Sequence, residues 1–417
     1  MALATQPSEN VIALSGFEPA EAGLAMANRA ALARRFSTLV PLGPAVTGGL
    51  GVVQRARTTD AAAEVALKTP RHRPGCTTEE IRRDDATLAE EYKTLCQVRN
   101  LRFFPTAFGR ARTAEGEPAI LMEWVKGVSI DEYRDARWRN GCPGATVAAL
   151  GEALLTALDS TRALSATFIH RDLAPKNVII RTEETPLALQ EERGAFDVCL
   201  IDLGSAELVS HDLTFTQRAG LARGGQPPYA APEMLSDGMA AMGSRANQKV
   251  DVYAVASILY ELYCGSYPFG PALDRERAMR GAEADFGRVK LGACTPLAPK
   301  APADQSLCVL IGLCLAPRQA DRPSVAQFLA AIRRWRQSGE AGMRGTAAQI
   351  ATTKPQVNPY ARQQIKPSTP PQAEARIPME QIRRARRARM RKRMLSIAVI
   401  AVAVVAALVV IALLAAE

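Results

Sequence analysis

The stretch that decides the fold is IHRDLAPKNVII, residues 169–180. It places Asp172 and Asn177 five residues apart, directly before an apolar run that predicts a short buried strand. A carboxylate can accept the proton of an attacking hydroxyl, and an amide oxygen can ligate a magnesium ion held by a nucleotide. A strand in the core would hold both side chains on a rigid loop. This stretch therefore predicts a loop that performs chemistry at a phosphate.

Further motifs precede this loop. TGGLGVV at residues 47–53 predicts a strand–turn–strand whose glycines let the backbone approach phosphate oxygens. EVALK at 64–68 alternates as a strand and ends on Lys68, and EEYKTLCQV at 90–98 carries Leu95 and Val98 at helical spacing. AILMEWVKG at 119–127 predicts a buried strand followed by a turn.

More motifs follow the loop: CLIDLG at 199–204, PYAAPE at 228–233, KVDVY at 249–253 and ADRPS at 320–324. In this order the motifs resemble those of the eukaryotic-type (Hanks-type) serine/threonine protein kinases of bacteria, over about 300 of the 417 residues. The resemblance implies an α+β fold with a small β-rich N-lobe and a larger helical C-lobe. It also implies ATP and Mg²⁺, with Mn²⁺ as an alternative, and phosphorylation of serine and threonine hydroxyls on proteins, autophosphorylation included.

The resemblance assigns roles to residues of this sequence. The predicted catalytic residues are Asp172, Lys68, Lys176 and Asn177. The predicted metal ligands are Asn177 and Asp202. The predicted nucleotide-binding residues are Gly48, Gly51, Val53, Ala66, Lys68, Glu91, Glu123, Val125 and Ile179.

Some of these roles are specific. Lys68 would neutralise the α- and β-phosphates, held by Glu91 with Glu90 as the alternate partner. The Glu123 carbonyl and the Val125 amide would bind the edge of the adenine.

The C-lobe motifs carry further expectations. Glu233 would form a buried ion pair with Arg322, and Asp251 would brace the catalytic loop. Arg171 implies control by a phosphate on the activation segment, because a phosphate would give it a charge-assisted partner. The candidate acceptors are Ser210, Thr214 and Thr216.

Four positions depart from the family pattern. Val46 stands where the first glycine is expected, Leu203 replaces Phe, and Gln226 replaces a Thr that touches the catalytic Asp. Ala174 stands where serine/threonine kinases have Lys, so Lys176 is predicted to reach the γ-phosphate instead. The alternative interpretation is a nucleotide-binding pseudokinase scaffold at the membrane; a small-molecule kinase of the aminoglycoside or choline type is a further rival.

The charge pattern predicts a membrane tail. The net charge is +10, and eight of the eleven residues from Arg383 to Arg393 are Arg or Lys. This cluster directly precedes the uncharged segment 395–416, whose 22 residues would rise about 33 Å as a helix and cross a bilayer core of roughly 30 Å. The basic flank favours the cytoplasmic side and anionic lipids rather than nucleic acid. We therefore expect a single-pass membrane protein with a cytoplasmic kinase domain, and a homodimer stays open.

These patterns divide the chain. We predict an N-terminal extension (1–35), a kinase domain (36–337), a Pro/Gln-rich disordered linker (338–382), a basic juxtamembrane segment (383–394) and a transmembrane helix (395–416). The stretch 181–198 is about a dozen residues longer than the family needs, and its acidic residues predict a solvated surface insertion: Glu183, Glu184, Glu191 and Glu192. The eight scattered cysteines predict free thiols.

Overall fold

The computed structural model describes residues 11–21, 24–48, 51–60, 63–209, 225–236 and 243–338. They all belong to one compact unit, Met1–Thr353. The predicted linker beyond residue 338, the basic segment and the transmembrane helix lie outside the described residues, as do Ser210, Thr214 and Thr216. Within the described part of the chain, no helix is both long enough and apolar enough to span a membrane.

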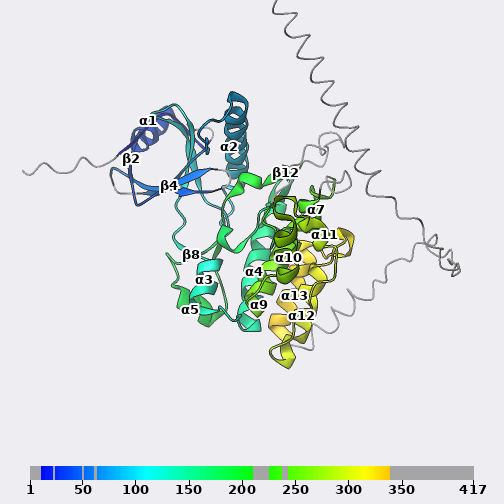
Figure 1. The fold of residues 1–417 in the computed structure, drawn as a ribbon. Coiled ribbons are helices and arrows are strands. Elements are labelled where there is room, and N and C mark those ends of the chain that lie inside the picture. Colours follow the sequence, from blue (N-terminus) through cyan, green and yellow to red (C-terminus); the bar gives the residue numbers. More distant parts are fainter. Residues whose placement is uncertain are drawn as a thin grey trace, which may run out of the picture. The chain divides into compact units, whose positions relative to one another are not determined.

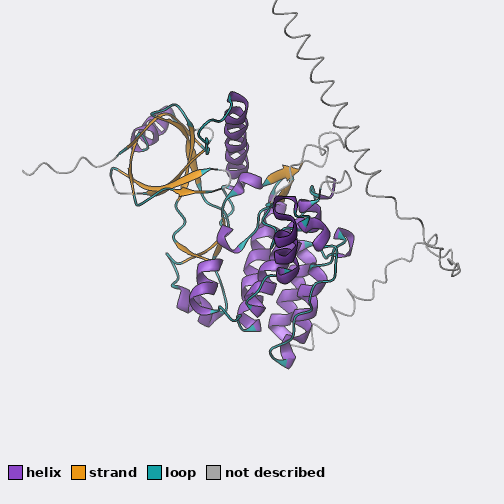
Figure 2. Ribbon diagram, in the orientation of Figure 1, coloured by secondary structure: helices purple, strands orange, loops and turns teal. Residues whose placement is uncertain are grey.

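The N-lobe is built on a seven-stranded antiparallel sheet in the order β2-β1-β6-β7-β5-β4-β3. Its strands are β1 (Ile12–Pro19), β2 (Thr38–Pro41), β3 (Val46–Thr47), β4 (Val52–Thr58), β5 (Glu64–Thr69), β6 (Ala107–Thr113) and β7 (Pro118–Glu123). Because β2 also pairs with β4, the sheet closes on itself as a barrel (Figure 2). Small and branched apolar side chains fill its interior, among them Leu14, Leu39, Val65, Leu67 and Leu121.

The N-terminal extension contributes to this barrel. Strand β1 pairs with both β2 and β6, and helix α1 (Met26–Arg35) follows it. No sequence pattern predicted this strand, because a register shift between Ser15 and Glu18 breaks its alternation and Gly16 adopts a left-handed φ of 62°. Only Leu14 of β1 is fully buried. The boundary at residue 36 stays a prediction, but residues 12–19 are part of the N-lobe sheet.

Helix α2 (Thr78–Val98) packs against the barrel (Figure 1). It begins at a capping box, in which the Thr77 side chain and that of Glu80 bond each other's backbone N–H groups. Its buried residues are spaced three and four apart on one face: Leu88, Glu91, Thr94, Leu95 and Val98. This spacing turns Glu91 inward.

The C-lobe is mainly helical, as the resemblance implied. Its α-helices are α3 (Ile130–Arg137), α4 (Gly144–Ser160), α5 (Leu187–Arg193), α7 (Pro232–Leu235), α9 (Lys249–Cys264), α10 (Gly270–Arg280), α11 (Phe286–Val289), α12 (Gln305–Cys314) and α13 (Val325–Ser338). Short 3₁₀ turns are η1 (Thr161–Ala163), η2 (Pro175–Asn177), η3 (Leu203–Ser205), η4 (Gly281–Glu283), η5 (Pro302–Asp304) and η6 (Gln319–Asp321). Helix α9 is buried without interruption from Val250 to Tyr263, so it forms the centre of the lobe.

Two small sheets hold the loops that face the N-lobe. One has the order β11-β10-β8, from β8 (Gly127–Ser129), β10 (Val178–Arg181) and β11 (Val198–Leu200). The other pairs β9 (Thr167–Ile169) with β12 (Glu207–Val209). The catalytic loop thus leaves one small sheet and enters the other, which fixes both of its ends.

The insertion at 181–198 is less completely solvated than its acidic residues predicted. It forms α5, and Gln190 is buried, bonding the Arg181 and Thr185 carbonyls at 2.6 and 2.7 Å. The expectation of a wholly solvated acidic segment is wrong for Glu191, which accepts a 2.7 Å hydrogen bond from the Tyr133 hydroxyl. A turn of helix brings these two neighbours against the lobe, while Glu183, Glu184 and Glu192 are exposed.

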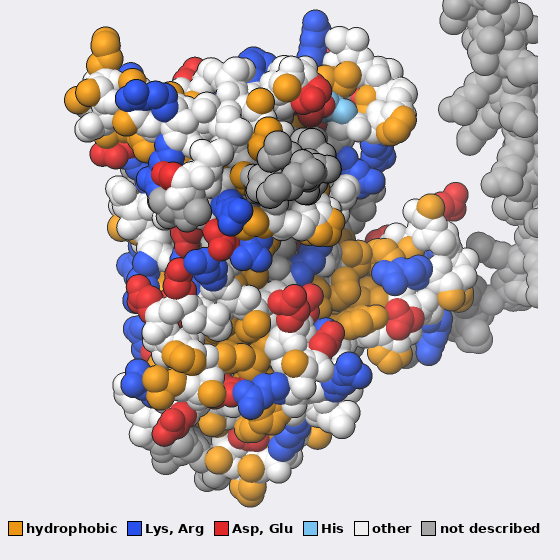
Figure 3. Space-filling model, turned by 90° about the vertical axis from the view of Figure 1, so that its left-hand side faces the viewer, with side chains coloured by type: hydrophobic (Ala, Val, Ile, Leu, Met, Phe, Trp, Pro, Cys, Tyr) orange, Lys and Arg blue, Asp and Glu red, His pale blue; other side chains and the backbone are white. Residues whose placement is uncertain are grey.

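All eight cysteines are free thiols, which confirms the prediction from their spacing. On the face shown in Figure 3, acidic and basic side chains are interspersed over the barrel and the helices below it. Neither positive nor negative charge dominates that face.

Candidate active site

The Asp172–Asn177 loop is held in one conformation by hydrogen bonds. The Asn177 amide nitrogen donates to the Asp172 carbonyl at 2.8 Å and to its carboxylate at 3.3 Å. The other carboxylate oxygen accepts a 3.4 Å bond from the Gln226 amide. Burial raises the pKa of Asp172, although His170, Gln226 and Lys176 act in the opposite direction. Lys176 itself is exposed.

Asp251 braces the loop from below, as the sequence predicted. Its fully buried carboxylate accepts the backbone N–H of His170 at 2.8 Å and that of Arg171 at 2.9 Å. Arg171 has a left-handed φ of 66°, a conformation that costs free energy in a non-glycine residue. Two hydrogen bonds to one buried anion offset that cost, so the brace fixes the direction in which Asp172 leaves the backbone.

Three charged side chains from three elements meet in what we call the cleft cluster: Lys68, Glu91 and Asp202. The Lys68 ammonium lies 2.6 Å from Glu91 on α2 and 2.7 Å from Asp202, the residue before η3. Glu90, the alternate partner, points outward and pairs with Lys93.

The charges of this cluster stabilise one another. Burial acts to lower the pKa of Lys68, but Glu91 and Asp202 outweigh it and hold that pKa above its ordinary value. Burial acts to raise the pKa of Asp202, and the Lys68 ammonium outweighs it, so that carboxyl is more acidic than usual. Lys68 is therefore cationic and Asp202 anionic near neutral pH.

Backbone pairing brings the cleft cluster to the catalytic loop. Strands β10 and β11 pair side by side, and the Ile201 N–H donates to the Asn177 carbonyl at 2.9 Å. Asp202 follows directly, with a left-handed φ of 61°. Leu203 is buried in the same hydrophobic core as Leu95 of α2, so the replacement of Phe keeps an apolar plug between the lobes.

The residues predicted to contact the nucleotide lie on the neighbouring strands. A Cβ on Gly51 would lie 2.7 Å from the Thr69 carbonyl and 3.3 Å from Cε of Lys68, so no side chain fits there. Gly48 closes the turn by donating to the Gly51 carbonyl at 2.8 Å. Val53 pairs with Lys68 in register, next to β5, which carries the buried Ala66. Exposed Val46 faces Val53 across β3 and β4.

The strand and turn predicted to bind the edge of the adenine carry an ion pair that the sequence did not predict, which we call the Glu123–Arg181 clamp. The carboxylate of Glu123 binds Arg181 and accepts the Thr106 N–H at 3.0 Å. Burial acts to raise the pKa of Glu123, but Arg181 and Thr106 outweigh it and keep the carboxyl ionised. Val125 follows in the half-buried link to β8, and half-buried Ile179 lies on β10. The adenine contacts of these residues stay predictions.

Arg171 has a partner that the sequence reading missed. It forms an ion pair with Glu207 of β12, five residues after Asp202. Strand pairing sets this contact, because Glu207 lies opposite Ile169 in the β9–β12 ladder. A phosphate on the activation segment would have to share Arg171 with this carboxylate, and control by such a phosphate stays a prediction.

Glu233 and Arg322 form the ion pair that the resemblance implied. Two guanidinium nitrogens bind the two carboxylate oxygens at 2.6 and 2.9 Å, and Arg322 is 2% exposed. The guanidinium also lies 4.8 Å from the centre of the Tyr253 ring. This pair fixes the end of the segment that begins at Gln226.

The metal-binding expectation fits the donors present. Magnesium prefers oxygen ligands and takes one or two protein groups together with substrate phosphates. The Asn177 amide bonds Asp172 through its nitrogen, so its oxygen is the atom suited to a metal, and Asp202 supplies a partly exposed carboxylate. Among the described residues no cluster of three or more His, Cys, Asp or Glu side chains could hold a metal alone. Two oxygen ligands and a phosphate-bearing nucleotide therefore match the site.

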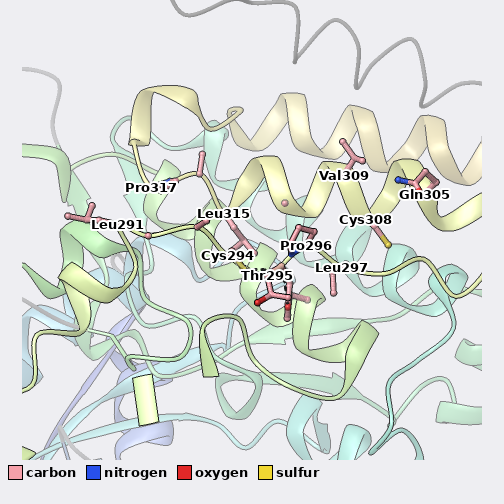
Figure 4. Close-up of a pocket in the computed structure, with 15 residues that line it drawn as sticks. Leu291, Cys294, Thr295, Pro296, Leu297, Gln305, Cys308, Val309, Leu315 and Pro317 are labelled. Carbon is pink, nitrogen blue, oxygen red and sulfur yellow. Dashed lines mark hydrogen bonds between the residues drawn. The ribbon is translucent and has the colours of Figure 1, made fainter. Parts of the chain in front are cut away.

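A separate cavity of about 420 Å³ lies in the C-lobe, between residues 291–297 and α12 (Figure 4). Its lining includes Leu291, Cys294, Leu297, Cys308 and Val309 but no acidic or basic side chain. It contains none of the predicted site residues.

Comparison with known proteins agrees with this geometry. The family model described as protein kinase domain matches residues 41–332. The chain therefore belongs to the protein kinase domain family.

Several bacterial proteins are similar to it. It is 30% identical over 229 residues to the serine/threonine-protein kinase pkn3 of Myxococcus xanthus, covering 53% of this chain and 37% of that protein. It is 34% identical over 152 residues to the serine/threonine-protein kinase PkaB of Streptomyces coelicolor, covering 36% and 32%. It is 31% identical over 155 residues to the serine/threonine-protein kinase PknF of Mycobacterium tuberculosis, covering 37% and 29%. The matches span about a third of the length of these relatives.

Proposed function

We propose that this chain is a protein serine/threonine kinase, which transfers the γ-phosphoryl group of ATP to hydroxyl groups of proteins, itself included. The observation that carries the proposal is the convergence of Lys68, Glu91 and Asp202 next to the braced Asp172–Asn177 loop. Family membership and the names of the relatives support it.

In this proposal some residues neutralise the charge of the phosphates, and others position the reacting groups. Lys68, oriented by Glu91, binds phosphate oxygens, and Asp172 orients the acceptor hydroxyl and takes its proton. Exposed Lys176 reaches the γ-phosphate in place of the absent lysine at Ala174. Asn177 and Asp202 would hold Mg²⁺, with Mn²⁺ as an alternative; the ion, when bound, neutralises charge on the phosphates.

The nucleotide base lies between the lobes in this proposal. The backbone of residues 48–51 covers the phosphates, and Val53, Ala66 and Ile179 enclose the base. The Glu123 carbonyl and the Val125 amide bind its edge, and the clamp between Glu123 and Arg181 fixes that backbone.

The decisive experiment is transfer of labelled γ-phosphate from Mg-ATP to a generic protein acceptor. We expect incorporation on serine and threonine by the unaltered chain and none above background by Asp172→Asn. Phosphoamino-acid analysis of the product separates serine and threonine from tyrosine. Nucleotide binding without any transfer would make the chain a pseudokinase.

We also propose that residues 395–416 anchor the chain in a membrane as a single span, with the kinase domain in the cytoplasm. An uncharged run of 22 residues behind the basic cluster 383–394 supports this, and residues 338–382 would serve as the tether. The full chain should float with anionic vesicles, whereas a chain ending at residue 394 should float less and lose what remains at high salt. Crosslinking on the same vesicles tests for a homodimer. Equal flotation of both chains would refute the anchor.

A further inference from the structure

The segment from Gly225 to Ala231 lies at the catalytic base. The Gln226 amide bonds the Asp172 carboxylate at 3.4 Å, and a Cβ on Gly225 would lie 3.0 Å from the Arg171 carbonyl. The segment therefore lies directly against the carboxylate that would accept the proton of an acceptor hydroxyl. We call residues 225–231 the acceptor segment.

The middle of the acceptor segment is fastened by Lys290, the residue that follows α11. Its ammonium donates to the Pro228 carbonyl at 3.1 Å and to the Ala230 carbonyl at 2.7 Å. These bonds fix the backbone on both sides of Tyr229. The Tyr229 hydroxyl in turn donates to Glu261 at 2.7 Å, so the loop is held by its backbone and by its one large side chain.

Burying the Lys290 side chain at this position costs free energy. Its side chain is fully buried, and no carboxylate of the described residues bonds its ammonium. Burial lowers the pKa of Lys290 to about 7 and outweighs the opposing effects of Cys294 and Glu233. The Tyr253 ring, 5.0 Å away, gives a partial substitute for water on one side, and Arg322 lies against the same ring. Met could fill the volume without a charge, so the stability of the core does not explain a lysine here.

The ammonium of Lys290 orients the backbone of the acceptor segment. Two carbonyls of a loop without regular strand partners point at one donor, which forces the loop to present its other face toward Asp172. Charged or neutral, the Lys290 amine has an N–H group for each of the two carbonyls, so it can hold both of them around neutral pH. The backbone of 228–230 is therefore set before any acceptor arrives.

We propose that Lys290 is a positioning residue for the protein acceptor: it fixes the acceptor segment so that a serine or threonine hydroxyl is aligned with Asp172. The role rests on the proposed kinase activity and concerns the acceptor and not the nucleotide. Its signature is a KM for the acceptor that depends on Lys290, together with a KM for ATP that does not.

The chain offers a control for the contacts of Lys290 at Lys300, although Lys300 is exposed. Its ammonium also points at two carbonyls, Asn140 at 3.4 Å and Cys142 at 3.3 Å, and lies 5.1 Å from the centre of the Tyr263 ring. It makes no contact with the acceptor segment. Lys300→Met therefore removes a similar set of contacts at a place where no effect on the acceptor is expected.

The test uses the full chain with Lys290→Met, Lys290→Arg and Lys300→Met. Steady-state kinetics give KM for an acceptor peptide, KM for ATP and kcat, and thermal unfolding with binding of a fluorescent ATP analogue verifies the fold. For Lys290→Met we expect the peptide KM to rise by about tenfold or more, with the KM for ATP within about twofold. Lys290→Arg, which can still donate to both carbonyls, should lie nearer the unaltered chain, and Lys300→Met should match it.

Two results would overturn the proposal. One is an unchanged peptide KM in Lys290→Met, and the other is an equal rise of both KM values. If Lys290→Met does not fold, Lys290→Gln is measured by the same criterion. Absence of transfer by the unaltered chain would overturn the kinase activity itself, and this proposal with it, so the two failures are distinguishable.

Discussion

Two of the groups of buried charged residues in this protein differ in how far solvent reaches them. The cleft cluster joins Lys68, Glu91 and Asp202 from separate elements, and the Asp202 side chain is 36% exposed. In the C-lobe, Glu233 pairs with Arg322, whose guanidinium lies over the Tyr253 ring, and we call these three residues the buttress cluster. There Arg322 uses both ends of its guanidinium on one carboxylate and is nearly inaccessible.

The difference separates a reacting site from a supporting one. An ion pair with every partner in place can only hold elements together, whereas a carboxylate open to solvent can accept a metal or a phosphate-bearing ligand. The cleft cluster should therefore matter to activity more than to stability. The buttress cluster should matter to stability first.

The largest effect is expected at the open end of the cleft cluster. Asp202→Asn should lower phosphoryl transfer by about a thousandfold, or about 4 kcal/mol of barrier, because it removes the one carboxylate charge that the site offers to magnesium. The free energy of unfolding should change little, since Lys68 keeps Glu91. Transfer assays and urea unfolding measure the two effects.

Asp197→Asn is the matched control, because Asp197 is also partly exposed and pairs with Arg102 at 2.8 Å, outside the site. It should retain activity. Similar activity losses in Asp202→Asn and Asp197→Asn would show that Asp202 has no special role in transfer.

A large effect on stability is expected at the buttress cluster. Arg322→Met leaves Glu233 buried without its partner, which should cost about 3–5 kcal/mol of unfolding free energy. Denaturant unfolding gives this value directly. Arg318→Met, which removes an exposed pair with Asp321, should stay near the unaltered chain. A loss confined to activity would contradict the supporting role.

A smaller effect on stability is expected at the strand that closes the barrel. Leu14→Ala should lower the unfolding free energy by about 2 kcal/mol, because it removes the buried side chain of β1. Val11→Ala lies just before the strand at a 49% exposed position and serves as the control. Equal midpoints for both variants in thermal unfolding would show that β1 adds nothing to the N-lobe.

The smallest effect is expected in the dependence of kcat on pH. Asp172 must be ionised to take a proton, and burial raises its pKa, so kcat should be full above that raised pKa and fall as the pH drops through it. Gln226 acts to lower this pKa, so Gln226→Leu should move the acid limb of the profile to higher pH. Asp202 does not titrate in this window, because Lys68 keeps its pKa below the ordinary value. A pH profile of kcat for both proteins is the measurement, and an unmoved limb contradicts the assignment.

Sequence alone was sufficient where function and spacing coincide. Asp172 and Asn177 lie five residues apart on one loop, and Glu91 was placed by the helical spacing of its neighbours. The Glu233–Arg322 pair followed from the family resemblance, although 89 residues separate its members. In these cases a local pattern marks each residue.

No local sequence pattern predicted the remaining contacts. Glu207 reaches Arg171 only because β12 pairs with β9, and Lys290 reaches the acceptor segment from a loop without a motif. Strand β1 lost its alternation at Gly16, and Gln190 was hidden in an acidic stretch. Glu207, Lys290 and β1 depend on partners far along the chain, and Gln190 depends on the way its own segment folds back. Residue type and periodicity specify neither kind of contact.

The most direct test of the account is binding of Mg-ATP to the cleft cluster, measured by titration calorimetry on the full chain and on Lys68→Met. We expect saturable binding at millimolar nucleotide or below for the unaltered chain, and a Kd at least about tenfold weaker, or about 1.4 kcal/mol, for the variant. Equal affinities, or no binding by the unaltered chain at millimolar nucleotide, would contradict the claim that these three charges form the nucleotide site.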